Sequence, residues 1–136
     1  MRLILKIITL FLMVAICSAC NKDADLHGVA QDDIQAPQVN IIQPIAKDSV
    51  NGNGTIALKA SVIENDQLHQ YGYWVRNKAT GEEYATFSKH QHTGYVAIDT
   101  NLTLSNITAG TTLSVQVYAS DHTGNQNAKT IEVYVR

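Results

Sequence analysis

The segment that decides the fold spans residues 111–120 and reads TTLSVQVYAS. Its apolar side chains stand at every second position, at Leu113, Val115, Val117 and Ala119. Successive side chains of a strand point to opposite faces of a sheet, so this spacing predicts a strand with one buried face. A helix is disfavoured because the segment is rich in β-branched residues and alternates strictly.

The same period of two, broken by turn residues, recurs from residue 37 onward. Six further strands are predicted, at residues 38–43, 55–63, 69–77, 82–88, 95–104 and 128–136. The segments between them are dense in Gly, Asn and Asp, which favour turns. Seven short strands without an amphipathic helix pattern predict an all-β fold, a seven-stranded antiparallel β-sandwich that forms one domain at residues 37–136.

Three segments carry a resemblance to known domains. Residues 37–41 (PQVNI), 64–68 (ENDQL) and 117–125 (VYASDHTGN) resemble bacterial Ig-like, cadherin-like domains. The chain is similar to a group of poorly characterised Bacteroidetes lipoproteins that carry one such domain, with a His-x-His motif in its middle. The resemblance covers most of residues 37–136 and implies an Ig-like sandwich on the cell envelope.

The first nineteen residues have the pattern of a signal peptide. Arg2 and Lys6 precede and flank an apolar run that continues over residues 7–15, too short to span a bilayer comfortably. Residues 16–20 read ICSAC and resemble the lipobox of bacterial lipoproteins, whose cysteine becomes the first mature residue and carries the lipid. The resemblance implies acyl chains such as palmitate on Cys20 and a membrane anchor at that residue.

The residues around Cys20 add detail to this prediction. Cys17 stands three residues before Cys20, where the lipobox has leucine, so an ordinary signal peptide is the alternative. Residues 21–25 (NKDAD) resemble the export signal of Bacteroidetes surface lipoproteins, which implies an outer-membrane or cell-surface location, facing the periplasm or the outside. Residues 20–36 lack periodicity and are predicted to be the lipidated cysteine and a flexible tether.

Charge and composition exclude some classes of function. Without Arg2 and Lys6 the chain has eight basic and twelve acidic residues, a formal charge of −4. A nucleic-acid partner is therefore not predicted, because it calls for a basic patch. No nucleophile–base pair and no pair of acids stands out in the sequence, so an enzyme is not predicted either.

Four histidines are predicted to lie at one end of the sandwich. If consecutive strands alternate in direction, the connections at residues 64–68, 89–94 and 121–127 share one end. His69 follows the first of these connections, His90 and His92 lie in the second, and His122 lies in the third. Residues two apart in a strand point to the same face, so His90 and His92 are also expected to present their rings side by side.

A cluster of imidazoles is the donor set that zinc and copper prefer. The sequence thus favours a zinc or copper site with His90 and His92 as its central ligands and His122 and His69 as the third and fourth. The alternative is four solvated loop histidines without a ligand role. Asp121 offers a calcium ligand in principle, but its place in the turn Asp121–Asn125 favours a carboxylate that accepts backbone N–H groups.

Trp74 is the only tryptophan and allows two orientations of its strand. If Tyr71, Tyr73 and Val75 point inward, Trp74 lies on the outer face, where it would suit a glycan or protein partner. The opposite orientation buries Trp74 as a core anchor. The first orientation supports the rival hypothesis of a non-catalytic adhesion or assembly module, and a spacer without any ligand is the third interpretation.

Overall fold

The computed structural model describes residues 33–136. These residues form eight strands: β1 (Gln38–Gln43), β2 (Ser49–Val50), β3 (Gly54–Ile63), β4 (Leu68–Asn77), β5 (Glu83–His90), β6 (Tyr95–Leu104), β7 (Thr112–Asp121) and β8 (Gln126–Val135). This part of the chain contains no helix, which confirms the predicted all-β fold. Accordingly, none of its elements is a helix long and apolar enough to cross a membrane.

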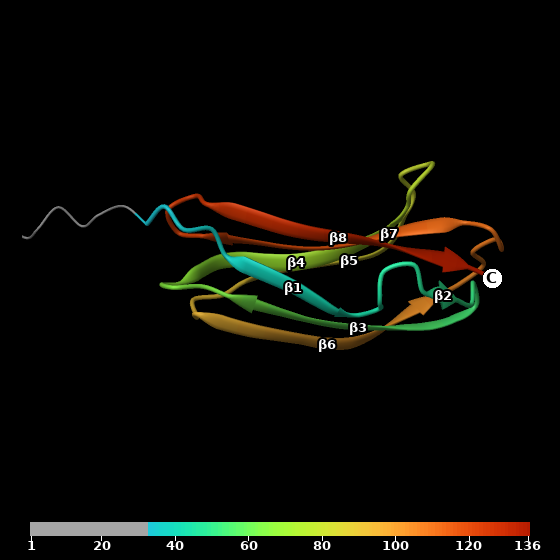
Figure 1. The fold of residues 1–136 in the computed structure, drawn as a ribbon, viewed down its shortest axis with the longest axis horizontal. Coiled ribbons are helices and arrows are strands. Elements are labelled where there is room, and N and C mark those ends of the chain that lie inside the picture. The colour runs from blue at the N-terminus through green and yellow to red at the C-terminus, as the bar shows by residue number, and fades with distance from the viewer. Residues whose placement is uncertain (1–32) are drawn as a thin grey trace, which may run out of the picture. The chain divides into compact units, whose positions relative to one another are not determined.

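The strands form two sheets packed face to face, as Figure 1 shows, with β3 and β6 in one layer and β4, β7 and β8 in the other. The order is β1-β3-β6 in the smaller sheet and β2-β8-β7-β4-β5 in the larger one. The seven predicted strands correspond to β1 and β3 to β8, with bounds that differ by at most two residues. The β-sandwich is therefore present.

The eighth strand, β2, was not predicted. It pairs in parallel with β8, Ser49 opposite Tyr134 and Val50 opposite Val135, so the larger sheet is mixed and not purely antiparallel. The N–H of Tyr134 donates to the Asp48 carbonyl (2.8 Å) and the N–H of Arg136 to the Val50 carbonyl (3.0 Å). A strand of two residues is too short to show a period of two, so the turn-rich composition of residues 47–54 hid it.

The core lies between the two sheets and follows the predicted alternation. In β7 the side chains of Leu113, Val115 and Val117 are completely buried, and in β3 those of Leu58 and Val62 are too. Burying such a side chain contributes about 1.5–3 kcal/mol relative to leaving it in water. Residues 33–136 thus form a compact unit around a core of their own.

The register of the strands places three connections at one end of the sandwich. Ile63 pairs with Tyr95, Gln70 with His90, and Leu68 with Asp121. The β3–β4, β5–β6 and β7–β8 connections therefore meet at the end where β8 begins, on the left in Figure 1. This agrees with the arrangement that strand direction predicted.

Candidate functional site

Backbone hydrogen bonds hold the β5–β6 connection against the start of β4. The N–H of Leu68 donates to the Thr93 carbonyl (3.0 Å) and the N–H of Gln91 to the His69 carbonyl (3.2 Å). Gly94 approaches the β3–β4 connection so closely that a Cβ there would lie 3.1 Å from the Glu64 carbonyl oxygen. The sequence His-Thr-Gly thus lets the loop fold back onto β4, and this return positions His92.

The four predicted histidines come together at this end. The His69 ring lies 4.4 Å from the His90 ring and 5.0 Å from the His122 ring, measured between centroids. The His92 ring lies 4.6 Å from the rings of both His90 and His122 and stacks on the latter. All four histidines are exposed. His69 lies at the start of β4 and His90 at the end of β5, whereas His92 and His122 lie in the β5–β6 and β7–β8 connections.

His90 and His92 are neighbours for a different reason from the one predicted. β5 ends at His90, so His92 lies in the connection and not on the same strand face. Their contact comes from the loop that turns back toward β4. The prediction of side-by-side rings is correct in outcome, but the common strand face behind it is wrong.

Hydrogen bonds link three of the rings into a chain with His92 at its centre. The Nε2 atoms of His90 and His92 are 2.9 Å apart, and His92 Nδ1 is 2.8 Å from His122 Nε2. A neutral imidazole has one N–H and one bare nitrogen, so His92 donates to one neighbour and accepts from the other. Both nitrogens of His92 are therefore engaged within the cluster.

The chain of rings is close to a metal-binding geometry but is not a closed cage. Two ligands at 2.0–2.1 Å from a tetrahedral zinc ion are about 3.3 Å apart, so the Nε2 atoms of His90 and His92 need to separate by about 0.4 Å to bind one ion. His122 faces Nδ1 of His92, so it joins the same ion only after a side-chain rotation. Such rotations are inexpensive for exposed side chains.

The electrostatics of the cluster favour neutral imidazoles. Partial desolvation lowers the pKa of His90, and the charges that His69, His92 and His122 carry when protonated lower it further. A metal binds the neutral ring and competes with the proton for the same nitrogen. His90 is therefore held in the form that a metal ion requires.

Asp121 has the turn role that the sequence predicted. Its Oδ1 accepts the N–H groups of Thr123 and Asn125, both at 2.9 Å, and its Oδ2 accepts the Asn125 side-chain amide at 2.7 Å. Burial raises the pKa of Asp121, but these hydrogen bonds outweigh it and leave the pKa below its ordinary value. The same turn carries His122, so Asp121 fixes the backbone beside one of the candidate ligands.

Trp74 lies on the outer face of the larger sheet, in the orientation that leaves Val75 and Tyr71 buried. The Arg76 guanidinium carbon is 4.6 Å from the centre of the indole, which is half-buried. An open groove of about 580 Å³ runs beside it. The groove is lined by Gln70, Trp74, Arg76, Thr86, Gln116, Tyr118, Ala119, Ser120, Gln126, Asn127 and Ala128.

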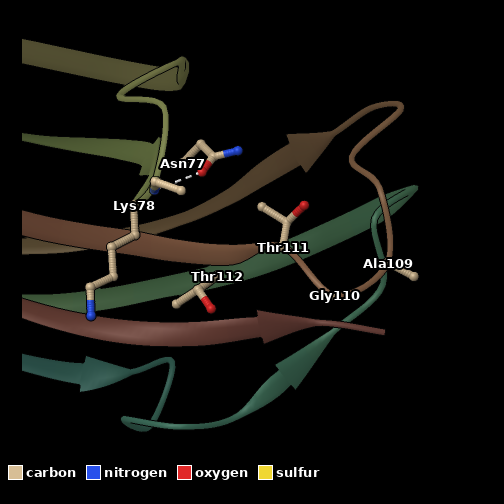
Figure 2. Close-up of a pocket in the computed structure, with 7 residues that line it drawn as sticks. Asn77, Lys78, Ala109, Gly110, Thr111 and Thr112 are labelled. Carbon is tan, nitrogen blue, oxygen red and sulfur yellow. Dashed lines mark hydrogen bonds between the residues drawn. The ribbon is translucent and has the colours of Figure 1, made fainter.

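Another hollow, of about 570 Å³, lies at the opposite end of the sandwich, between the β4–β5 and β6–β7 connections. Figure 2 shows its lining residues Asn77, Lys78 and Thr112. Lys78 is the only charged residue in this lining, and its Nζ is 2.6 Å from a Glu132 carboxylate oxygen. The sequence singled out no residue here.

Some predictions lie outside the described residues. These are the signal peptide at 1–19, the lipidated Cys20 and the tether up to residue 32. In contrast, Asp33 is described, and its carbonyl accepts hydrogen bonds from Thr123 Oγ1 (2.9 Å) and Asn125 Nδ2 (2.7 Å). The segment before β1 is thus attached to the β7–β8 connection, which the sequence did not indicate.

Comparisons with known proteins support the fold only. No family model matches the chain, and no curated protein matches it. Among solved structures the chain is similar to wild-type OgpA from Akkermansia muciniphila, with a TM-score of 0.50 and 10% sequence identity. The match covers 76% of this chain and only 30% of the OgpA chain. At this identity the likeness bears on the β-sandwich and on nothing finer.

Proposed function

We propose that this protein is a lipid-anchored cell-envelope domain that binds zinc or copper through its histidine cluster. His90 and His92 are the central ligands, and His122 and His69 are the third and fourth. The observation that carries the proposal is the contact of four imidazole rings from the start of β4, the end of β5 and two connections. The domain is non-catalytic in this proposal.

Two features favour a metal site over four unrelated loop histidines. Solvated histidines have no reason to gather, because each ring that becomes protonated repels the others. Here three of the rings, those of His90, His92 and His122, are within hydrogen-bonding distance through their nitrogens, the same atoms that bind a metal. The lowered pKa of His90 keeps its ring available as a ligand.

Titration of a fragment of residues 21–136 with zinc, and separately with copper, tests this proposal by calorimetry. The fragment contains the whole compact unit. The double variant His90→Ala/His92→Ala should lose binding, and Gln91→Ala, which changes the residue between them, should retain it. Affinity weaker than about 1 mM, or equal affinity in the double variant and the Gln91→Ala control, would contradict the proposal.

The sandwich is proposed to be Ig-like. Its smaller sheet holds β1, β3 and β6, and its larger sheet places β7 and β8 beside β4, the grouping by which Ig-like domains separate their A, B, E and C, F, G strands. β1 and the two-residue β2 then correspond to the two halves of a first strand that changes sheets.

The motif at residues 16–20 supports the anchor at Cys20 and an outer-membrane or surface location. Metabolic labelling with palmitate, lost in Cys20→Ala, tests the anchor.

The outer face of the larger sheet supports a second candidate function, an adhesion or assembly module that binds a glycan or a protein. Its specific support is the indole of Trp74 beside a groove of amide and hydroxyl side chains. Iodide quenching of this single tryptophan measures its accessibility, and Trp74→Ala should abolish retention on glycan arrays. A blue-shifted, unquenched emission would count against this face as a binding surface.

A further inference from the structure

The groove beside Trp74 is a trough that crosses the strands of the larger sheet. Residues that pair across neighbouring strands form rows on the face of a sheet. The central row of this outer face consists of Ser88, Gly72, Tyr118 and Ala128. Three of these four side chains are small, so the face is low along this row.

Tyr118 forms the floor of the trough. A Cβ at Gly72 would lie 2.5 Å from the Tyr118 hydroxyl oxygen and 2.6 Å from its Cζ. Because a Cβ is bonded directly to its Cα, the end of the Tyr118 ring rests on the backbone of β4. The tyrosine therefore lies across the sheet instead of standing away from it, and its ring is half-buried.

The two flanking rows form the walls of the trough. One wall consists of Thr86, Trp74, Gln116 and Thr130, and the other of His90, Gln70, Ser120 and Gln126. These rows are four residues apart along each strand, so their backbones are separated by about 13 Å. The walls thus present hydroxyl and amide groups on both sides of an aromatic floor.

One amide in each wall is held in a fixed orientation. Gln116 Nε2 donates to Thr130 Oγ1 (2.9 Å), and Gln70 Nε2 donates to Ser88 Oγ. Each of these amides also has a carbonyl oxygen and a second N–H with which to bind a ligand. Polar groups that are already ordered bind at a lower entropic cost than freely rotating side chains.

Arg76 is the single charged residue in the groove lining, and its charge is compensated. Its Nε and Nη2 donate to Oε2 of Glu83, at 3.1 and 2.8 Å. Its guanidinium also lies over the indole of Trp74, so one face of the indole is already occupied. The lining therefore has no unpaired cation with which to attract an anionic ligand.

We propose that this trough binds a neutral glycan, with a sugar ring packed on Tyr118 and sugar hydroxyls bonded to Gln70 and Gln116. An aromatic ring packs on the C–H face of a sugar, and amides both donate to and accept from its hydroxyls. The inference rests on the second candidate function and narrows it to an uncharged glycan, with Tyr118 as the floor of the site and Trp74 in its wall.

A protein partner fits this trough less well than a glycan. β4 and β7 each pair with a strand on both sides, so they offer no free edge to an added strand. The only aliphatic side chains in the lining are those of Ala119 and Ala128. The centre of a protein–protein interface is typically more apolar than this.

Affinity electrophoresis of the 21–136 fragment in EDTA tests the site. The neutral probes are glucan, mannan and galactan, and the anionic probes are heparin and polygalacturonate. At least one neutral polysaccharide should retard the fragment, and the anionic ones should not. The variant His90→Ala/His92→Ala should be retarded like the wild type, which separates this proposal from the zinc or copper site.

Substitutions of the floor locate the binding. Tyr118→Ala should weaken binding of the retarding polysaccharide at least about tenfold. Tyr118→Phe keeps the ring and should bind within about threefold of the wild type. The matched control is Tyr134→Ala, which removes a tyrosine that is 41% exposed on β8 but lies outside the trough, and it should bind like the wild type.

A second variant tests the walls without removing the floor. Gln70→Ala/Gln116→Ala changes two half-buried polar side chains and should also weaken binding at least about tenfold, whereas Gln38→Ala in the smaller sheet should not. Thermal unfolding checks that each variant is folded, and the glutamine variant decides the matter if Tyr118→Ala is not. Unchanged binding in the folded variants of the trough would overturn the proposal.

The probes also separate this inference from the function on which it rests. Retardation by an anionic polysaccharide alone would overturn the neutral glycan and leave the adhesion module in place. Retardation by no polysaccharide would overturn the inference as well. Iodide quenching of Trp74 then shows independently whether the face is open to a protein partner.

Discussion

His92 is the residue on which the histidine cluster depends. It contacts His90 through Nε2 and His122 through Nδ1, so it links two connections that are otherwise separate. A metal ion that takes one of these nitrogens replaces a ring–ring hydrogen bond and leaves the other nitrogen to orient the ring. A second hydrogen bond of this kind is what commonly fixes the tautomer of a metal-bound histidine.

The lowered pKa of His90 predicts a pH dependence of stability for the metal-free domain. Desolvation and the neighbouring histidines place the folded-state pKa below the ordinary 6.5. Between these two values the unfolded chain binds a proton that the folded chain does not, so stability falls as the pH drops below about 6.5. The decrease in stability reaches its full extent once the pH is below the folded-state pKa of His90.

Urea unfolding at pH 7.5 and 5.5 measures this effect. The midpoint should fall on acidification in the wild type, and by less in His90→Gln, which removes the titrating ring. The control is Gln91→Ala, which should behave as the wild type does. An equal fall in His90→Gln and the wild type would show that His90 does not contribute.

The sequence predicted the histidine cluster far better than it predicted the surroundings of Glu64 and Asp33, for a physical reason. Strand direction alone brings the four histidines to one end, and imidazoles are chemically distinctive wherever they lie. Glu64 stands in the segment Glu-Asn-Asp-Gln, whose composition predicts an exposed turn, so its burial is visible only in the fold. Asp33 was assigned to the tether because nothing local indicates its bond to the β7–β8 connection.

At the scale of elements, β4 combines a buried face and an outer face that carries Trp74 within ten residues. Its register with β5 and β7 leaves Trp74 between Thr86 and Gln116 on the outer face. Gly72 lies on the same face, and a Cβ there would meet the Phe87 carbonyl oxygen and the Tyr118 ring at less than 3.0 Å. Tyr118 can cover the strand only because position 72 has no side chain.

Gly72→Ala should therefore destabilise the domain by about 1–3 kcal/mol, because the backbone of β5 or the Tyr118 ring must move. Chemical denaturation measures the change. Gly54→Ala is the matched control in β3, since the nearest atom to its Cβ would be at an ordinary 3.7 Å. If both substitutions have the same small effect, the close packing of Tyr118 on Gly72 is not important for stability.

At the scale of the whole molecule, the sandwich is a scaffold that brings four histidines from separate segments to one end. Period-two patterns were enough to predict a sandwich, and the alternating direction of its seven strands predicted the shared end. The switch of sheets between β1 and β2 was not predictable, because it depends on the free edge of β8 and not on residues 47–50 themselves. The local sequence pattern thus determined seven of the strands, whereas the free edge of β8 determined where β2 forms.

This separation of scaffold and site leads to a last prediction, for Leu58 in the middle of β3. Leu58 is completely buried, so Leu58→Ala should cost about 2–5 kcal/mol, whereas Ile63→Ala, at a position 50% exposed, should cost much less. The histidines are held by hydrogen bonds among the connections, about five residues or roughly 16 Å along the strand from Leu58. The zinc affinity of Leu58→Ala, measured where it remains folded, should stay within about twofold of the wild type. A large loss of affinity would mean that the core, and not the connections, sets the geometry of the cluster.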